Sequence, residues 1–247
     1  MKKTIIANLK MNQSPTETKK YMISLLPRVE ACKNEVVVCP PFTSLCVASD
    51  LAQGFSLSIG AQNVCEFEDG ACTGEIGVKM LSDIGVSHII IGHSERRKNF
   101  QESDKKINKK VKLALKSRFK IILCVGESRA ERMSGKTALV LKKQIEEATS
   151  GLYENELANI VFAYEPVWAI GSGEAATEKQ ICESVHILRQ TIADLYSQTA
   201  SKNVKIVYGG SVTEENCKKI CNCAGVDGLL VGGASLCAEK FAKICKC

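Results

Sequence analysis

The sequence predicts an α/β protein whose eight parallel strands close into a barrel surrounded by helices. Eight short apolar runs, rich in β-branched residues, recur along the 247 residues, and longer segments with helical spacing lie between most of them. The runs do not alternate strictly with polar residues, which indicates strands that are buried on both faces. Eight such strand and helix units in about 250 residues fit a closed (β/α)8 barrel.

The predicted strands are short, and most are followed by a segment long enough for a helix. They are TIIANL at 4–9, EVVVCP at 35–40, SLSIGA at 56–61, SHIIIG at 87–92, KIILCV at 120–125, IVFAYE at 160–165, VKIVYG at 204–209 and VDGLLVG at 226–232. Helix-start signals are present as well, because Ser14 is followed by Pro15 and Glu17, and Thr177 can cap the helix after it. Connections of this length join parallel strands.

The main alternative architecture is an open, doubly wound sheet. Such a sheet usually binds a dinucleotide through a GxGxxG turn directly after its first strand, whereas the first strand here leads into NLKMNQS. A looser nucleotide-binding pattern, AERMSGKT at 130–137, begins within a charged helical segment and does not follow a strand directly. No Pro/Gly/Ser-rich linker divides the chain, so we expect one barrel domain over residues 1–247.

The composition is that of a globular protein, with 45% hydrophobic and 24% charged residues. The apolar run near the amino terminus is too short for a signal peptide or a membrane span, so we expect a cytoplasmic protein. Thirteen cysteines scattered through strand-like runs favour free thiols, and two CxC pairs, at 221–223 and 245–247, lack the usual zinc spacing. The charge of +6 is dispersed, and KKINKKVKLALK at 105–116 has the spacing of a solvated helix face, so neither nucleic acid nor a membrane is an expected partner.

Polar residues that directly follow the predicted strands are the candidate site residues. The active site of such a barrel lies at the carboxyl ends of its strands, so these residues are expected to converge on one mouth. They are Asn8, Lys10, His93, Ser94, Glu165, Ser211, Gly232 and Gly233.

Three of these residues have ionisable side chains, and each has two interpretations. Glu165 closes the apolar run NIVFAYE, where a charge is costly to bury, so it is either an ion-pair member or a functional carboxylate. His93 lies at a strand-to-helix junction, where backbone amides favour a neutral, functional imidazole. The alternative is a core histidine that merely caps the following segment. Lys10 either raises the positive potential of the mouth or is an ordinary exposed ammonium.

Glycine-rich segments indicate a phosphate site and a lid. The pairs in YGGSV and LLVGGAS place free amides before helical stretches, after the last two strands, where such barrels commonly bind phosphate. PVWAIGSGEAA follows Glu165 directly and is typical of a lid that excludes water, the alternative being a plain surface loop. The lid residues are Pro166, Val167, Trp168, Ala169, Ile170, Gly171, Ser172, Gly173, Glu174, Ala175 and Ala176.

Several motifs resemble the triosephosphate isomerase family along nearly the whole chain. They are NLKMN, IIIGHSERR, AYEPVWAIGSG, IVYGGSV and DGLLVGGASL. The resemblance implies a TIM barrel and a cofactor-free isomerase of glycolysis and gluconeogenesis that interconverts dihydroxyacetone phosphate and D-glyceraldehyde 3-phosphate through an enediolate. It further implies that Glu165 is the base, His93 the electrophile and Lys10 the cationic group, and that Asn8 adds a hydrogen bond.

The same resemblance implies roles for residues around this set. Gly171, Ser211, Gly232 and Gly233 would hold the substrate phosphate. Ser94, Glu95 and Cys124 would support the site from behind.

The resemblance also implies a homodimer, in which QNVCEFEDGACTGEIG at 62–77 projects toward the active site of the partner subunit. Asn12, Cys72 and Thr73 would then lie at the interface. Cys72 replaces the aromatic residue often found before that threonine, and we expect a thiol reagent that modifies Cys72 to loosen the dimer.

Two alternatives remain. Another phosphate-binding barrel enzyme would share the final glycine pairs but need different catalytic groups after strands one, four and six. An inert barrel that acts as a thiol-rich binding protein would use its cysteines or its basic surface. The set of Lys10, His93 and Glu165 argues against both.

Overall fold

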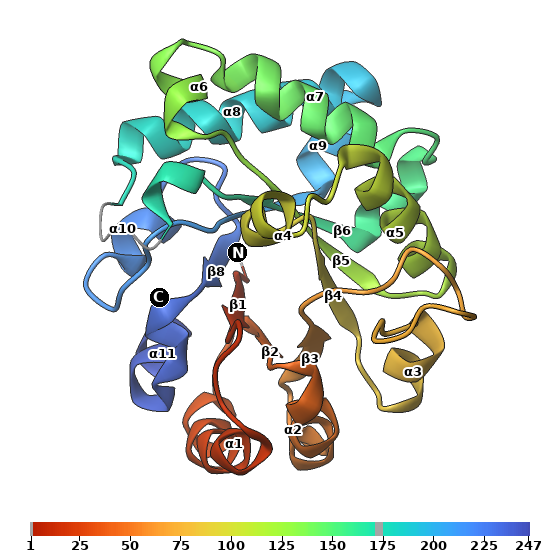
Figure 1. Cartoon of the computed structure of the whole chain (residues 1–247). Helices are drawn as coiled ribbons and strands as arrows, with labels where there is room; N and C mark the ends of the chain where they lie inside the picture. The colour runs from red at the N-terminus through yellow and green to blue at the C-terminus, as the bar shows by residue number, and fades with distance from the viewer. Residues whose placement is uncertain (1, 171–174) are drawn as a thin grey trace.

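The computed structural model describes residues 2–170 and 175–247, in which eight strands form a closed parallel barrel (Figure 1). Each strand pairs with the next in chain order, and β1 also pairs with β8, which closes the sheet. The strands are β1 Thr4–Asn8, β2 Glu35–Cys39, β3 Ser58–Ala61, β4 His88–Ile91, β5 Lys120–Val125, β6 Ile160–Tyr164, β7 Lys205–Tyr208 and β8 Gly228–Val231. The predicted barrel is therefore confirmed, and the open sheet is excluded.

Helices surround this barrel (Figure 1). The α-helices are α1 Pro15–Val29, α2 Leu45–Ala52, α3 Val78–Asp83, α4 Ser94–Asn99, α5 Asp104–Lys116, α6 Arg129–Met133, α7 Thr137–Thr149, α8 Glu178–Leu195, α9 Gln198–Asn203, α10 Cys217–Cys221 and α11 Ala238–Ile244. Short 3-10 helices are η1 Phe42–Ser44, η2 Glu154–Asn159, η3 Val167–Ala169 and η4 Gly233–Leu236. Both helix-start signals are confirmed, because Ser14 and Thr177 form capping boxes at the starts of α1 and α8.

Alternate residues of each strand contribute to two cores. In β1, Ile6 faces the inside of the barrel, whereas Ile5 and Ala7 pack toward the helices. The inner core consists of Ile6, Val37, Cys39, Ile90, Ile122, Cys124, Val161, Ala163, Val207 and Leu230. Burial on both faces explains why the strands read as continuous apolar runs, and some of the cysteines serve as small apolar core residues.

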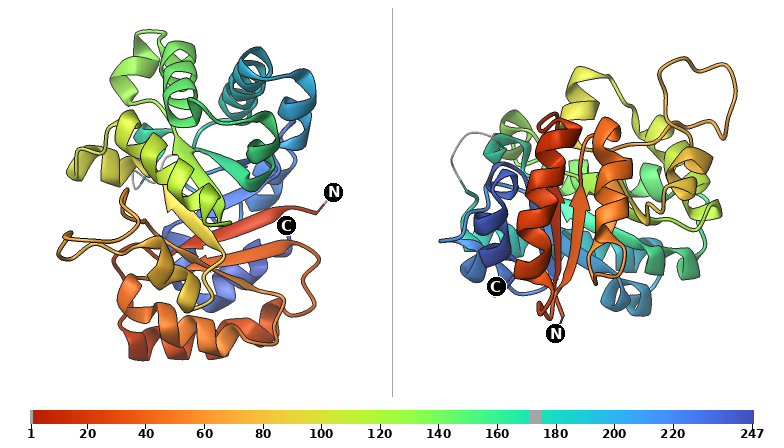
Figure 2. Two further views of the ribbon diagram at one scale, coloured as in Figure 1. Left: turned by 90° about the vertical axis from the view of Figure 1, so that its right-hand side faces the viewer. Right: turned by 90° about the horizontal axis from the view of Figure 1, so that it is seen from below.

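The chain termini and the polar segments that follow the strands lie at opposite ends of the barrel. Both chain termini lie at the end where the strands begin, and the segment 62–77, between β3 and α3, projects from the body of the protein (Figure 2). The polar segments after the strands lie at the opposite end. No helix among the described residues is long and apolar enough to cross a membrane.

Closure of the barrel requires a glycine at position 228. Gly228 pairs with Thr4 across the β1 and β8 seam, and a Cβ at position 228 would lie 1.9 Å from the Thr4 carbonyl oxygen. We predict that Gly228→Ala lowers the free energy of unfolding by about 1–3 kcal/mol, because the two strands must separate to admit the methyl group.

Urea unfolding measures this change. Gly233→Ala is the matched control, since no described atom lies within 4 Å of a Cβ at that position. Equal stability losses in the two variants would contradict the prediction.

Candidate active site

A cavity of about 330 Å³ opens at the carboxyl ends of the strands. Its walls come from segments that follow β1, β4, β6, β7 and β8, so residues far apart in the sequence meet there. Of the residues predicted from the sequence, it brings together Asn8, Lys10, Asn12, His93, Glu165, Ser211, Gly232 and Gly233. Gly171 lies outside the described residues.

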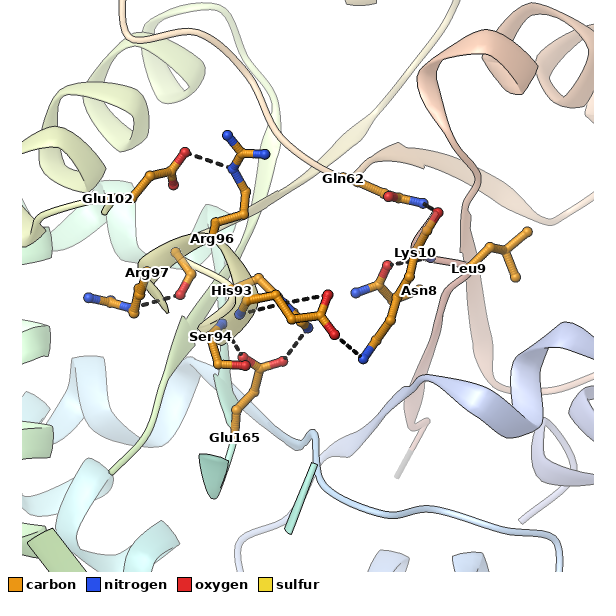
Figure 3. A network of polar contacts seen from close by, with 12 residues as sticks. Asn8, Leu9, Lys10, Gln62, His93, Ser94, Arg96, Arg97, Glu102 and Glu165 are labelled. Atoms are coloured by element: carbon orange, nitrogen blue, oxygen red, sulfur yellow. Dashed lines mark hydrogen bonds and ion pairs between the residues drawn. The ribbon is translucent and has the colours of Figure 1, made fainter. Parts of the chain in front are cut away.

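The Glu165 carboxylate is almost completely buried, with 2% of the residue exposed. Its Oε2 accepts a hydrogen bond from the Ser94 amide at 3.1 Å, and its Oε1 lies 3.0 Å from His93 Nε2 (Figure 3). Burial raises the pKa of Glu165. His93, the Ser94 amide and Lys10 together lower this pKa by more than burial raises it, so the net direction is downward. The cavity therefore contains an ionised carboxylate whose oxygens are both occupied by protein donors.

The backbone around Glu165 is held closely by its neighbours. The Glu165 amide donates to the Val125 carbonyl at 2.8 Å. A Cβ at Gly126 would lie 1.7 Å from the Glu165 carbonyl oxygen, and a Cβ at Gly209 would lie 2.9 Å from Glu165 Cγ. Glycine at both positions lets the neighbouring chains approach, which fixes the Cα of Glu165.

His93 is the N-cap residue of α4, and its ring orientation fixes a tautomer. Its Nδ1 accepts a hydrogen bond from the Glu95 amide at 3.2 Å. An imidazole nitrogen that accepts a hydrogen bond carries no proton, so the neutral ring has its proton on Nε2 and directs it toward Glu165.

Several groups act on the pKa of His93. Burial lowers it, the Glu165 carboxylate and, to a smaller extent, the Glu95 carboxylate raise it, Lys10 lowers it, and the net direction is upward. The largest upward contribution comes from the carboxylate that lies beside Nε2, whereas the Glu95 amide opposes a second proton at Nδ1. When the Glu165 carboxylate leaves Nε2, burial, the Lys10 charge and this amide favour the neutral ring against the smaller effect of the Glu95 carboxylate.

Lys10 has a left-handed backbone, with φ of 53°, which is uncommon for a residue with a side chain. Asn8 Oδ1 accepts a hydrogen bond from the Lys10 amide at 3.1 Å, and Gln62 Nε2 donates to the carbonyls of Lys10 and Cys39, each at 2.9 Å (Figure 3). The ammonium lies 2.5 Å from Glu95 Oε1. These contacts hold a conformation that costs about 1–3 kcal/mol on its own.

The amides of Ser211, Gly232 and Gly233 form a rim suited to an anion. Gly233 is the first residue of η4, and these three amides donate to no acceptor within the described residues. The neighbouring loop is held by Asn216, whose Nδ2 donates to the Ser211 carbonyl at 3.1 Å. A Cβ at Gly232 would lie 3.5 Å from Lys10 Cε, so the lysine stem runs beside this rim. Free amides with an adjacent ammonium can bind a phosphate.

The described part of the predicted lid is attached to the barrel by Glu127. Glu127 Oε1 accepts hydrogen bonds from Trp168 Nε1 and Tyr164 Oη, both at 3.1 Å, and the Glu127 carbonyl accepts one from the Val167 amide at 3.1 Å. The Arg132 guanidinium carbon lies over the Trp168 ring, 5.3 Å from the centroid of that ring. Pro166 is the N-cap of η3, and Ala169 is buried.

The far end of the segment has a separate anchor. The Ala176 amide donates to Tyr208 Oη at 3.2 Å, next to exposed Ala175, and Ile170 reaches the wall of the cavity. The four lid residues Gly171, Ser172, Gly173 and Glu174 lie outside the described residues.

A buried ionic network lies behind α4. The Lys110 ammonium lies 2.5 Å from Glu102 Oε1 and 2.8 Å from Asn63 Oδ1, and Arg96 Nε lies 2.7 Å from the same Glu102 oxygen. Lys110 is 1% exposed, which corrects the interpretation of residues 105–116 as a solvated face at this position. Since Arg96 belongs to α4, the network fixes the helix that carries Ser94 and follows His93.

Cys124 lies in the inner core, close to Glu165. Burial, and then the Glu165 charge, raise its pKa well above the usual value, so it is a protonated thiol. Its position agrees with a supporting role.

The residues assigned to an interface lie in two places. Asn12 is at the mouth, where its Nδ2 donates to the Leu9 carbonyl at 2.8 Å. Cys72 and Thr73 lie on the projecting segment 62–77, and Cys72 lines a separate hollow of about 270 Å³ with Phe67 and Met80. A single chain therefore does not bring Asn12 to Cys72.

Sequence reasoning missed Gln62, Glu127 and Tyr208. Gln62 and Glu127 do follow predicted strands, so the strand-end rule would have found both residues. Tyr208 is the last residue of β7 and has no local signal, because its role depends on Ala176. Within residues 2–170 and 175–247, no group of three or more His, Cys, Asp or Glu side chains has a metal-binding arrangement.

Comparison with known proteins gives one family. The family model described as triosephosphate isomerase matches residues 3–247. The triosephosphate isomerases of Thermoanaerobacter pseudethanolicus and Caldanaerobacter subterraneus subsp. tengcongensis are each 47% identical to the chain over 245 residues, and that of Solibacter usitatus is 43% identical over 246 residues. Each alignment covers 99% of both chains.

The buried network behind α4 generates a prediction for stability. Lys110→Met leaves the buried Glu102 carboxylate without its closest cation, so we expect the free energy of unfolding to fall by about 3–5 kcal/mol. Lys109→Met, at an exposed position one residue away, should change it by less than about 0.5 kcal/mol. Urea unfolding of both variants tests this, and a Lys110 variant as stable as the Lys109 variant would refute it.

Proposed function

We infer from the membership of this chain in the triosephosphate isomerase family that it is an isomerase that interconverts dihydroxyacetone phosphate and D-glyceraldehyde 3-phosphate. We propose that the reaction takes place in the 330 Å³ cavity, within one catalytic domain formed by residues 1–247. The observation that carries this proposal is the buried, ionised Glu165 carboxylate beside the Nε2 proton of His93, with the amide rim of Ser211, Gly232 and Gly233 in the same cavity.

The proposed reaction begins with removal of a proton from a substrate carbon next to the carbonyl. Glu165 takes this proton as the general base, and it must first leave the Ser94 amide and His93 that now occupy its oxygens. The product of this step is an enediolate. Glu165 then returns the proton to the neighbouring carbon while a proton passes from one substrate oxygen to the other, so that no redox cofactor is needed.

His93 and Lys10 stabilise the oxygens of the enediolate in this proposal. The neutral His93 ring donates a hydrogen bond from Nε2 to a substrate oxygen, which is the orientation that the Glu95 amide imposes. The Lys10 ammonium adds positive charge in a cavity of low dielectric constant. Asn8 serves chiefly to fix the Lys10 backbone, because its Oδ1 is occupied by the Lys10 amide.

The phosphate would bind at the rim formed by Ser211, Gly232 and Gly233. Their amides, which donate to no acceptor among residues 2–170 and 175–247, support this assignment together with the adjacent Lys10 stem. The family resemblance adds Gly171. We also propose that residues 166–176 close over the bound substrate, with Ile170 on the cavity wall, since exclusion of water would protect an enediolate that can lose its phosphate.

Replacement of the base tests the proposal directly. Glu165→Gln keeps the shape of the side chain but cannot accept the proton, so we expect kcat to fall by about 10²–10⁴-fold. A coupled assay for glyceraldehyde phosphate formation measures it. Glu178→Gln, an exposed carboxylate at the start of α8, is the control and should retain the wild-type rate.

The alternatives give different results in this assay. Equal rates for wild type and Glu165→Gln would remove Glu165 from the mechanism. A wild-type protein without activity would instead favour the inert, thiol-rich barrel.

We further propose that the protein is a cytoplasmic homodimer. Large apolar side chains are exposed on the segments that would meet, with Met11 96%, Phe67 52% and Met80 60% exposed. The hollow between the projecting segment 62–77 and α3 is lined partly by Phe67 and Met80 and has room for an apolar side chain from a second copy. The thirteen free thiols support a reducing compartment.

The dimer proposal predicts that a charge at Met11 weakens self-association. Met11→Asp places a carboxylate against an apolar surface, so the dimer Kd should rise about 30-fold or more. Sedimentation equilibrium measures the Kd. Met133→Asp, at a residue that is 83% exposed on α6, is the control and should leave it unchanged. The same Kd in both variants would place the interface elsewhere.

A further inference from the structure

Two cysteines that are distant in the sequence meet at the end of the barrel where the strands begin. Cys221 ends α10, Cys247 follows α11, and their sulfur atoms lie 2.8 Å apart. Both are free thiols. Each CxC pair contributes one cysteine to this contact, so the sulfur contact runs between the two motifs and not within either motif.

The backbone near Cys247 is anchored. Asn34 Nδ2 donates to the carbonyls of Cys245 and Cys247, at 2.9 Å and 3.1 Å, and Asn34 Oδ1 accepts a hydrogen bond from the Lys3 amide at 3.0 Å. The Cys247 sulfur is therefore held beside Cys221 by contacts other than the thiol pair itself, and a small movement brings the sulfurs to bonding distance.

The two thiols are not equivalent. The hydrogen bond from Cys247 lowers the pKa of Cys221, burial opposes this, and the Lys3 charge adds to the lowering. The same hydrogen bond raises the pKa of Cys247. Cys221 is thus the sulfur better able to carry the thiolate, while Cys247 retains the proton.

A basic groove gives access to this pair. It has a volume of about 820 Å³, and Cys247 lines it together with Lys2, Lys33 and Lys246. Cys247 is partly exposed, whereas Cys221 is buried. A small anionic reagent would therefore reach Cys247 first.

We propose that Cys221 and Cys247 form a reversible disulfide, and that the oxidant is an anionic small-molecule disulfide, such as glutathione disulfide, that binds in this groove. As the Cys247 sulfur attacks one sulfur of the reagent, its proton passes through the neighbouring Cys221 sulfur to the first small thiol, which departs and leaves a mixed disulfide on Cys247. The Cys221 thiolate then attacks the Cys247 sulfur and expels the second small thiol. Two electrons pass from the protein thiols to the reagent, and both protons end on its thiol products, directly or through water.

The disulfide would tie α10 to the segment after α11 and so enclose β8. Such a cross-link restricts the unfolded chain and stabilises the fold, with an expected rise in Tm of about 5 °C or more. The pair lies outside the catalytic cavity, so the inference stands whether or not the proposed catalytic roles hold.

Oxidation of the full-length protein with glutathione disulfide tests the proposal. After acid quench and alkylation of the remaining thiols, peptide mass spectrometry should find Cys221 linked to Cys247, and Tm should rise relative to the reduced protein. Cystamine, a cationic disulfide, should react several-fold more slowly at low ionic strength. Cys221→Ser should stop at a mixed disulfide on Cys247, and Cys247→Ser should show neither the link nor the rise in Tm.

Cys46→Ser is the matched control, because Cys46 is exposed and lies away from the groove, and it should retain the cross-link. Alkylation of both Cys221 and Cys247 after oxidation would overturn the proposal. So would a link between Cys182 and Cys223, a second pair of thiols in hydrogen-bond contact, in place of the proposed one. Equal rates with the two reagents would remove the basic groove from the proposal.

Discussion

The burial of a charged carboxylate at Glu165 is the constraint on which the rest of the site depends. A buried carboxylate remains ionised only if nearby donors and cations compensate for the lost water. The Ser94 amide, His93 and Lys10 supply this compensation from two other strand ends. In the proposed mechanism, two of these groups, His93 and Lys10, also stabilise the enediolate, so the stabilisation of the resting base and that of the intermediate would come from a single arrangement.

Glu95 connects the two sides of this arrangement. Its amide sets the tautomer of His93, and its carboxylate holds the Lys10 ammonium. Lys10 in turn has a strained backbone that Gln62 and Asn8 maintain. A residue that contacts no substrate in the proposed mechanism, Gln62, therefore determines where a catalytic charge lies, and its contribution comes through backbone geometry.

The sequence was sufficient for much of the fold and for part of the site. The strands were predictable because burial on both faces makes them continuous apolar runs, and Glu165 and His93 were predictable because strand ends converge in a barrel. Lys110 was not, because it lies on the buried face of α5 with Ile107, Val111 and Ala114, and only its pairing with distant Glu102 and Asn63 allows a lysine to be buried there. The contact of Cys221 with Cys247 was also inaccessible, because it depends on how α10 and α11 pack at one end of the barrel.

The close approach of β5 to Glu165 has a consequence for motion. With its amide bonded to Val125 and its carbonyl pressed against Gly126, the Glu165 Cα cannot travel with the segment that follows it. In the proposed mechanism, the carboxylate must therefore move between its protein donors and the substrate by rotation about its own side-chain bonds. The proposed closure of residues 166–176 would therefore leave the Glu165 Cα in place, and only the Glu165 side chain would change its orientation.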